Sequence, residues 1–182
     1  MQDKHQCGFA DDVVADFLRR SYAAVDGLWF VKIEEADGFA RALELDEQVW
    51  RIMPKIQARK GRELLGVEGN EAEGLARCFG LKLHADGHEY DISIGPDGVR
   101  ARVYHCCWLA AMRKSGRGDL AAAIGERVCT AEGQMWCQEF GGEYQFSLPC
   151  RRCDDGEYCE YVFTRTVGER HEEESDDSSS GD

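Results

Sequence analysis

The chain has few basic residues for its size and no cluster of them. Its 182 residues include 22 Lys and Arg against 35 Asp and Glu, a formal net charge of −13. Nucleic acids and anionic membranes are polyanions, which proteins hold with clustered Lys and Arg. An aromatic RNA-binding signature and a recognisable DNA-binding or ATPase segment are also missing from the sequence. We therefore expect no nucleic acid and no membrane as a partner.

Long apolar runs are missing as well. No stretch approaches the roughly 20 apolar residues that a membrane-spanning helix needs. The first residues, MQDKHQCGFADD, lack the basic and apolar segments of a secretory leader. These absences predict a cytoplasmic protein, in which most thiols stay reduced. Hydrophobic residues make up 43% of the chain, which is enough for one globular domain with a sizeable core.

Helical and strand spacings alternate along the chain. Apolar residues three and four apart predict helices over 11–35, from Asp46 onward, from Asn70 to about Gly80, over 108–115 and over 119–140. Period-two alternation predicts two hairpins, with strands at 90–94, 99–103, 144–148 and 159–163. Pro54 is expected to kink or break the second helix. The order predicts an α+β fold, in which an antiparallel sheet of about four strands packs against several helices.

The chain end differs in composition from the rest. Residues 168–182 contain seven acids, one Arg and no apolar side chain, which is typical of a disordered tail. We expect a single α+β metal-binding domain over residues 1–167, followed by this acidic tail.

The most specific motif is a cluster of cysteines, Cys150-Arg-Arg-Cys153-Asp-Asp-Gly-Glu-Tyr-Cys159. A C-x-x-C pair with a third thiol across a turn suits a thiophilic metal in tetrahedral coordination. Zinc is the expected metal, and an iron–sulfur cluster or a redox thiol pair is the alternative. A site with four thiolates leaves no open coordination position and is structural. The usual zinc hydrolase and deaminase signatures, such as H-E-x-x-H, are absent from the sequence.

The fourth ligand can be chosen by chain geometry. The strand before Cys150 covers roughly 20 Å at about 3.3 Å per residue, and returns beside a helix that rises about 1.5 Å per residue. The position reached lies about 13 residues before the helix end, which favours Cys129. Cys107 and then Cys106, which follow the second strand, are the next candidates, and Cys137 fits least.

Two families resemble parts of this sequence. The segment from Cys129 through Cys150 and Cys153 to Cys159 is similar to the C-terminal half of the 4-vinyl reductase domain, which implies these four cysteines as zinc ligands. Its spacing between the last two cysteines is shorter than usual there, and Cys150 stands where an acid is usual.

The second resemblance covers about 10–165. Asp26-Gly-Leu-Trp29-Phe30, Cys107-Trp108 and the closing cysteines resemble prokaryotic cytosolic proteins grouped with L-2-amino-thiazoline-4-carboxylic acid hydrolase-like proteins. This resemblance implies, as an alternative function, a hydrolase that acts on C–N or C–S bonds of a small heterocyclic substrate.

Four tryptophans are many for one domain, and they either fill a core or line an apolar pocket. The vinyl reductase resemblance implies a pocket for an aromatic or tetrapyrrole-type ligand. The candidate ligand-binding residues are Asp26, Trp29, Trp108, Glu132 and Trp136. We therefore predict a zinc-binding domain for a small aromatic or heterocyclic ligand, with a hydrolase or an iron–sulfur protein as the alternative. The sequence names no catalytic residue and leaves a homodimer open.

Overall fold

The computed structural model describes residues 8–166, so the predicted acidic tail at 168–182 lies outside the described residues. The helices are α1 (Asp11–Asp37), α2 (Phe39–Trp50), α3 (Met53–Leu65), α4 (Ala72–Asp86), α5 (Cys107–Lys114) and α6 (Ala121–Glu139). The strands are β1 (Glu89–Gly95), β2 (Gly98–His105), β3 (Tyr144–Ser147) and β4 (Cys159–Arg165), and short 3-10 helices cover Gly118–Leu120 and Arg152–Asp154. The α+β prediction is confirmed.

The four strands form one antiparallel sheet in the order β1-β2-β4-β3. The central strands bury one apolar face, which consists of Val99, Ala101, Val103, Tyr161 and Phe163. On the opposite face Glu160 pairs with Arg100 at 3.1 Å and with Arg102 at 2.9 Å. The sheet therefore has one face for the core and one polar face, as its alternating sequence requires.

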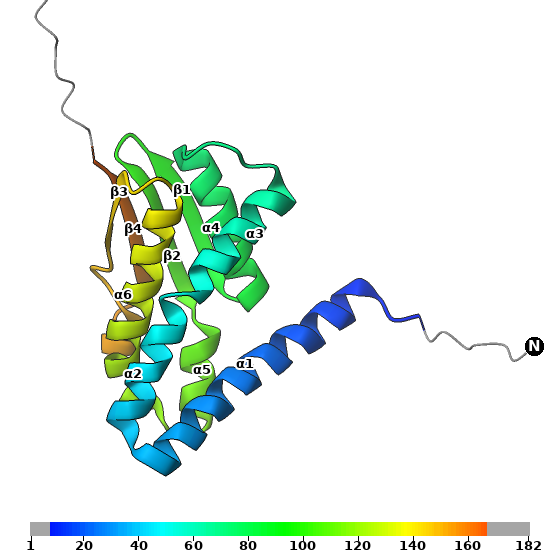
Figure 1. Cartoon of the computed structure of the whole chain (residues 1–182), viewed down its shortest axis with the longest axis vertical. Coiled ribbons are helices and arrows are strands. Elements are labelled where there is room, and N and C mark those ends of the chain that lie inside the picture. The colour runs from blue at the N-terminus through cyan, green and yellow to red at the C-terminus, as the bar shows by residue number, and fades with distance from the viewer. Residues whose placement is uncertain (1–7, 167–182) are drawn as a thin grey trace, which may run out of the picture.

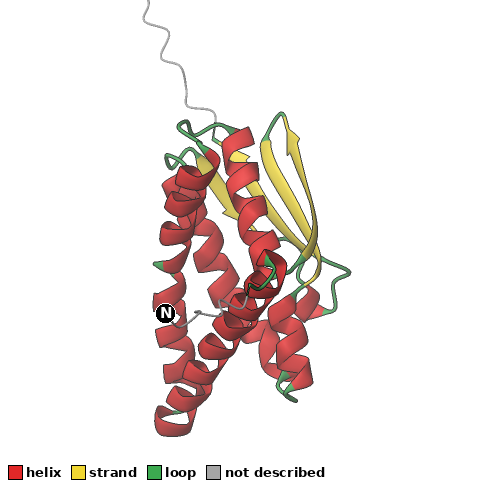
Figure 2. Cartoon of the chain, turned by 90° about the vertical axis from the view of Figure 1, so that its right-hand side faces the viewer, coloured by secondary structure: helices red, strands yellow, loops and turns green. Residues whose placement is uncertain are grey.

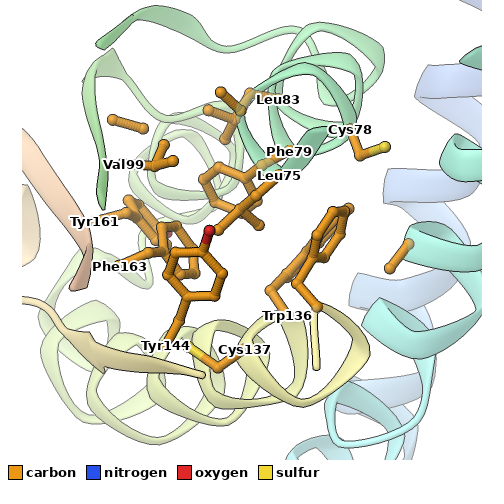
Figure 3. Packing of buried hydrophobic residues seen from close by; sticks show 14 of the residues in the cluster. Leu75, Cys78, Phe79, Leu83, Val99, Trp136, Cys137, Tyr144, Tyr161 and Phe163 are labelled. Carbon is orange, nitrogen blue, oxygen red and sulfur yellow. The ribbon is translucent and has the colours of Figure 1, made fainter. Parts of the chain in front are cut away.

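Helices cover the apolar face of the sheet on one side only (Figure 2). Phe79 of α4 lies at the centre of the core, with ring centroids 5.3 Å from Trp136 and 5.0 Å from Phe163 (Figure 3). Gly133 allows α6 to approach β3, since a Cβ at this position would lie 2.3 Å from the Phe146 ring. Close contact of helix and strand thus depends on a glycine.

Two helix boundaries differ from the sequence prediction. The second helix begins at Phe39 and not near Asp46, because Gly38 has a positive φ of 87° and separates it from α1. Pro54 lies in the first turn of α3, where its missing N–H is not needed, so the expected break falls between α2 and α3.

The helix predicted to begin at Asn70 corresponds to α4. It was expected to end near Gly80, but it continues to Asp86. Gly80 stays inside α4, and its carbonyl accepts a hydrogen bond from the Tyr90 hydroxyl at 2.8 Å. The helix ends at Gly87, which has a positive φ of 79°.

The first helix has the position least expected from its sequence. Figure 1 shows α1 meeting α2 at its C-terminal end and diverging from the other helices toward its N-terminus. None of its 27 residues is buried. Most of the apolar face predicted for residues 11–35 is therefore exposed, although Tyr22 packs against Trp108 of α5.

Candidate functional site

A cavity of about 530 Å³ lies between α1, α2, α5, α6 and the buried face of the sheet. Its walls are largely apolar and aromatic, with contributions from Phe30, Trp50, Trp108, Leu109, Val128 and Tyr161. The rings of Trp50 and Trp108 meet edge to face, with centroids 6.0 Å apart. This volume and lining are typical of a site for a small organic molecule.

A buried charge cluster forms one wall of this cavity. Lys82 on α4 pairs with Glu132 on α6, with Nζ 2.5 Å from Oε1, and with Asp86 one helical turn away at 3.2 Å. All three side chains are buried. Ionised groups in an apolar interior are costly unless they are paired, so this cluster depends on its mutual contacts.

The cluster has more acid than base. Burial alone would lower the pKa of Lys82, but Glu132 and Asp86 outweigh burial and raise it above its usual value, so the ammonium stays charged. Burial raises the pKa of Glu132, and the nearby ammonium opposes this shift. Two carboxylates thus share one ammonium, and the cluster is one positive charge short of neutral when both are ionised.

His88 lies next to this cluster and stays neutral. Its Nδ1 accepts the backbone N–H of Cys107 at 3.2 Å, which leaves the proton of a neutral imidazole on Nε2, 3.9 Å from Asp86. Burial and then the positive charge of Lys82 lower the pKa of His88 to about 3. The imidazole can therefore donate to the cluster without adding a charge.

Two further carboxylates line the cavity from the helices of the N-terminal half. Asp26 of α1 and Asp46 of α2 are both partly buried. Burial and the charge of Asp86 raise the pKa of Asp26 to about 6. Burial and the charge of Asp26 raise the pKa of Asp46 to about 7, although a hydrogen bond from Trp50 opposes the shift. Both acids therefore titrate close to neutral pH.

Four thiols lie along another part of the same cavity. They belong to Cys106, Cys129, Cys153 and Cys159. The Cys106 thiol accepts the N–H of Leu109 at 3.5 Å and caps α5, while the Cys159 thiol accepts the N–H of Arg152 at 3.3 Å. Burial raises the pKa of Cys129 and Cys159, the latter to about 11, so both are protonated thiols at neutral pH when no metal is bound.

The thiols suit zinc by their chemistry but not by their spacing in this structure. Within residues 8–166, no three His, Cys, Asp or Glu side chains are placed to hold a metal ion. Three of the predicted zinc ligands, Cys129, Cys153 and Cys159, share the cavity wall with Cys106. Zinc binding at this wall would require the thiol groups to rotate toward one another.

The other two predicted ligands lie elsewhere. Cys150 lines a separate, polar hollow, and its thiol donates to the carbonyl of Tyr158 at 3.0 Å. Cys107 is the first residue of α5 and does not line the cavity, and burial raises its pKa to about 12. The structure thus brings Cys106 to the same cavity wall as the other three thiols, while Cys150, though it lines the separate hollow, lies near enough to Cys159 to raise the pKa of that thiol.

The predicted ligand-binding residues are divided between cavity, core and surface. Asp26, Trp108 and Glu132 line the cavity. Trp136 is fully buried in the core and contacts Phe79, so it does not reach the cavity. Trp29 is 67% exposed, because it lies on the side of α1 that faces away from the body.

The most strongly charged part of the site was missed by the sequence interpretation. Lys82 and Asp86 continue the apolar spacing of Leu75 and Phe79 on α4, and charged residues at apolar positions are a signal of buried charge. The sequence interpretation missed this signal, because the predicted helix ended near Gly80. Asp46 was interpreted as a helix cap and not as a cavity residue.

Comparison with known proteins adds a family but no function. A family model described as "Family of unknown function (DUF6125)" matches residues 9–129. No curated protein and no solved structure matches the chain. The matched segment includes Asp26, Asp46, Lys82 and Cys129, and stops before the cysteine-rich turn at 150–159. The resemblances to vinyl reductase domains and thiazoline hydrolase-like proteins stay predictions.

Proposed function

The chain belongs to the DUF6125 family of unknown function, and we propose that it binds a small aromatic or heterocyclic molecule that carries N–H donors or a positive charge. The observation that carries this proposal is the excess of carboxylates on the wall of a largely apolar cavity. Apolar walls supply binding energy, while a few buried polar groups orient the ligand.

The ligand class follows from the charge balance. The carboxylates that line the cavity are Asp26, Asp46 and Glu132, and the only lining cations among residues 8–166 are Lys82 and Arg117. Both cations are already paired, Lys82 with Glu132 and Arg117 with Glu34. Within the described chain, Asp26 and Asp46 have no ion-pair partner, so they are free to accept hydrogen bonds or to neutralise a cation.

The test uses three matched aromatic probes, benzamidine, benzamide and benzoate, which differ in charge. A ligand at ten times its Kd stabilises the folded chain by about 1.4 kcal/mol, which raises Tm by a few degrees. We expect a rise with benzamidine, a smaller one with benzamide and none with benzoate, since benzoate would bring a further negative charge to an acidic wall.

A pocket-filling variant shows whether the cavity is the binding site. Val128→Trp places a large ring in the cavity, whereas Ala123→Trp adds the same ring on the exposed side of the same helix. We expect the benzamidine shift to disappear only in the first variant. An equal shift in both variants, or no shift in the unmodified protein, would contradict the proposed function.

A second candidate function is zinc binding by Cys106, Cys129, Cys153 and Cys159. It is supported by the place of these four thiols on one cavity wall. Bound zinc would link β4, α6 and the turn before β4, and so stabilise the fold.

Metal content tests this second candidate. We expect one zinc per chain in protein purified without a metal-binding tag, loss of zinc in Cys129→Ser and Cys153→Ser, and retention in Cys107→Ser. Retention in all three variants would contradict this ligand set. Iron with a visible charge-transfer band would favour the iron–sulfur alternative.

A further inference from the structure

The long helix α1 has two very different faces. Toward the body it places partly buried residues, among them Asp16, Arg19, Asp26 and Phe30, and some of these form a wall of the cavity. The opposite face is solvent-exposed and apolar. Its large side chains are 41–69% exposed and belong to Val13, Val14, Phe17, Leu18, Val25, Leu28 and Trp29.

This distribution is the reverse of an ordinary surface helix, which turns its apolar face to the core and its charges to water. The charged side chains Asp16, Arg19 and Asp26 lie on the side of the body, and Arg19 and Arg20 both pair with Asp16. Contiguous apolar surface of this extent is rare on monomeric proteins and marks an interaction site.

The spacing on the exposed face is that of a coiled-coil seam. Val14, Leu18, Ser21, Val25 and Leu28 follow one another at steps of four, three, four and three residues. The flanking positions are also uncharged. Ala15, Phe17 and Trp29 are exposed, whereas Tyr22 packs against Trp108 and Ala24 borders the cavity. A seam of this kind is complementary to another helix of the same pattern.

We propose that this face, the α1 seam of Val14, Leu18, Ser21, Val25 and Leu28 with its flanks, pairs with the same face of a second copy of this chain. The area is sufficient. Six exposed large apolar side chains of the seam and its flanks, at roughly 100 Å² each, provide about 600 Å² per copy, or about 1,200 Å² in total, which is the lower end of the range for specific interfaces.

Charge favours a second copy over a lipid surface. The chain has a net charge of −13, and α1 contains seven acids against three basic residues, so an anionic membrane would repel it. Over residues 14–28 the seam and its flanks carry no charge, so only uncharged side chains meet there. Access is open, because the outer side of α1 is free of other elements of the described chain (Figure 1).

The oligomeric state of the full chain tests this proposal directly. Sedimentation velocity over about 1–100 μM is expected to show a dimer, twice the chain mass of 20.5 kDa, that dissociates on dilution. The double variant Leu18→Glu with Val25→Glu places charges in the seam and is expected to be a monomer. Leu64→Glu on α3, a similarly exposed leucine outside the seam, is expected to remain a dimer.

A monomer at all concentrations would overturn the proposal, and so would a dimer that tolerates the two seam glutamates. If the double variant loses its helical circular dichroism, hydrogen exchange of the unmodified chain replaces it. Amides of residues 14–28 must then exchange at least tenfold more slowly at high than at low protein concentration. Equal exchange at both concentrations would also overturn the proposal.

Discussion

At the scale of single residues, the site depends on burying more carboxylates than the chain pairs with cations. Lys82 lies between Glu132 and Asp86, and Asp26 and Asp46 face the same cavity from other helices. Acids in such surroundings hold their protons to higher pH than in water. This environment makes them useful for binding near neutral pH.

The raised pKa of Asp26, about 6 against 3.8, predicts a pH-dependent cost for stability. A folded-state pKa above the unfolded value means that this acid destabilises the fold increasingly as pH rises from about 4 to above 6. We expect Asp26→Asn to be more stable than the unmodified chain at pH 8 by about 1 kcal/mol, after allowing for solvent screening, and equally stable at pH 4. Denaturant unfolding at both pH values measures the difference.

Asp16→Asn on the same helix is the matched control. Hydrogen bonds from Arg20 and Arg19 lower the pKa of Asp16, so its contribution has the opposite sign and is lost as pH falls. An Asp26→Asn variant that is less stable than the unmodified chain at pH 8 would contradict the electrostatic description of the cavity.

The buried pair gives a second prediction at this scale. Lys82→Met leaves Glu132 and Asp86 without their ammonium, and we expect a loss of about 3–5 kcal/mol in the free energy of unfolding. Lys82→Met combined with Glu132→Leu removes both partners of the shorter ion pair in this cluster and is expected to recover much of that loss. A double variant as unstable as the single one would show that the pair itself is not what the cluster needs.

At the scale of elements, sequence patterns located most helices and strands. Local spacing alone was sufficient to predict α1, the turn at 95–98 and the strands β3 and β4. These elements follow from the helical period or from the alternation of apolar residues. The end of α4 was not predicted, because glycine is compatible with both a helix interior and a helix end, and the helix continues through Gly80 to Asp86. The buried charge cluster was therefore not predicted, since Lys82 and Asp86 lie after Gly80 in the sequence.

Pocket residues were predictable only in part, for the same reason. Trp108 and Trp29 are both aromatic residues on predicted helices, so the sequence gives no reason to prefer one of them as a cavity residue. Only the packing of α1 shows that Trp108 lines the cavity and that Trp29 is exposed. Likewise Cys106 and Cys107 are neighbours in sequence, and the start of α5 decides which thiol joins the cavity wall.

The contact between α6 and β3 gives a prediction at this scale. Gly133→Ala would place a methyl group 2.3 Å from the Phe146 ring, so we expect a loss of about 1–3 kcal/mol from overpacking. Gly27→Ala on α1 is the control, because its Cβ would meet no atom within 4 Å and alanine favours a helix interior by about 1 kcal/mol. Thermal unfolding of the two variants should shift in opposite directions.

At the scale of the whole molecule, a half-covered sheet supports a cavity whose outer wall is a helix with little attachment to the core. Among residues 8–166, no helix has both the length and the apolar character to cross a membrane. Helix α1 takes part in both proposals, since Asp26 and Phe30 line the cavity while the exposed Val14, Leu18 and Val25 belong to the α1 seam, and Leu28 at the end of the seam borders the cavity as well.

Calorimetric titration of the full chain with benzamidine at pH 6.5, in two buffers of different ionisation enthalpy, tests the acidic cavity most directly. Asp26 and Asp46 are partly protonated at this pH, and a bound cation favours their ionised forms. We expect saturable binding with release of protons, up to about one per ligand. Binding without proton release, or no saturable heat at all, would contradict the assignment of this cavity as a site for cationic aromatic ligands.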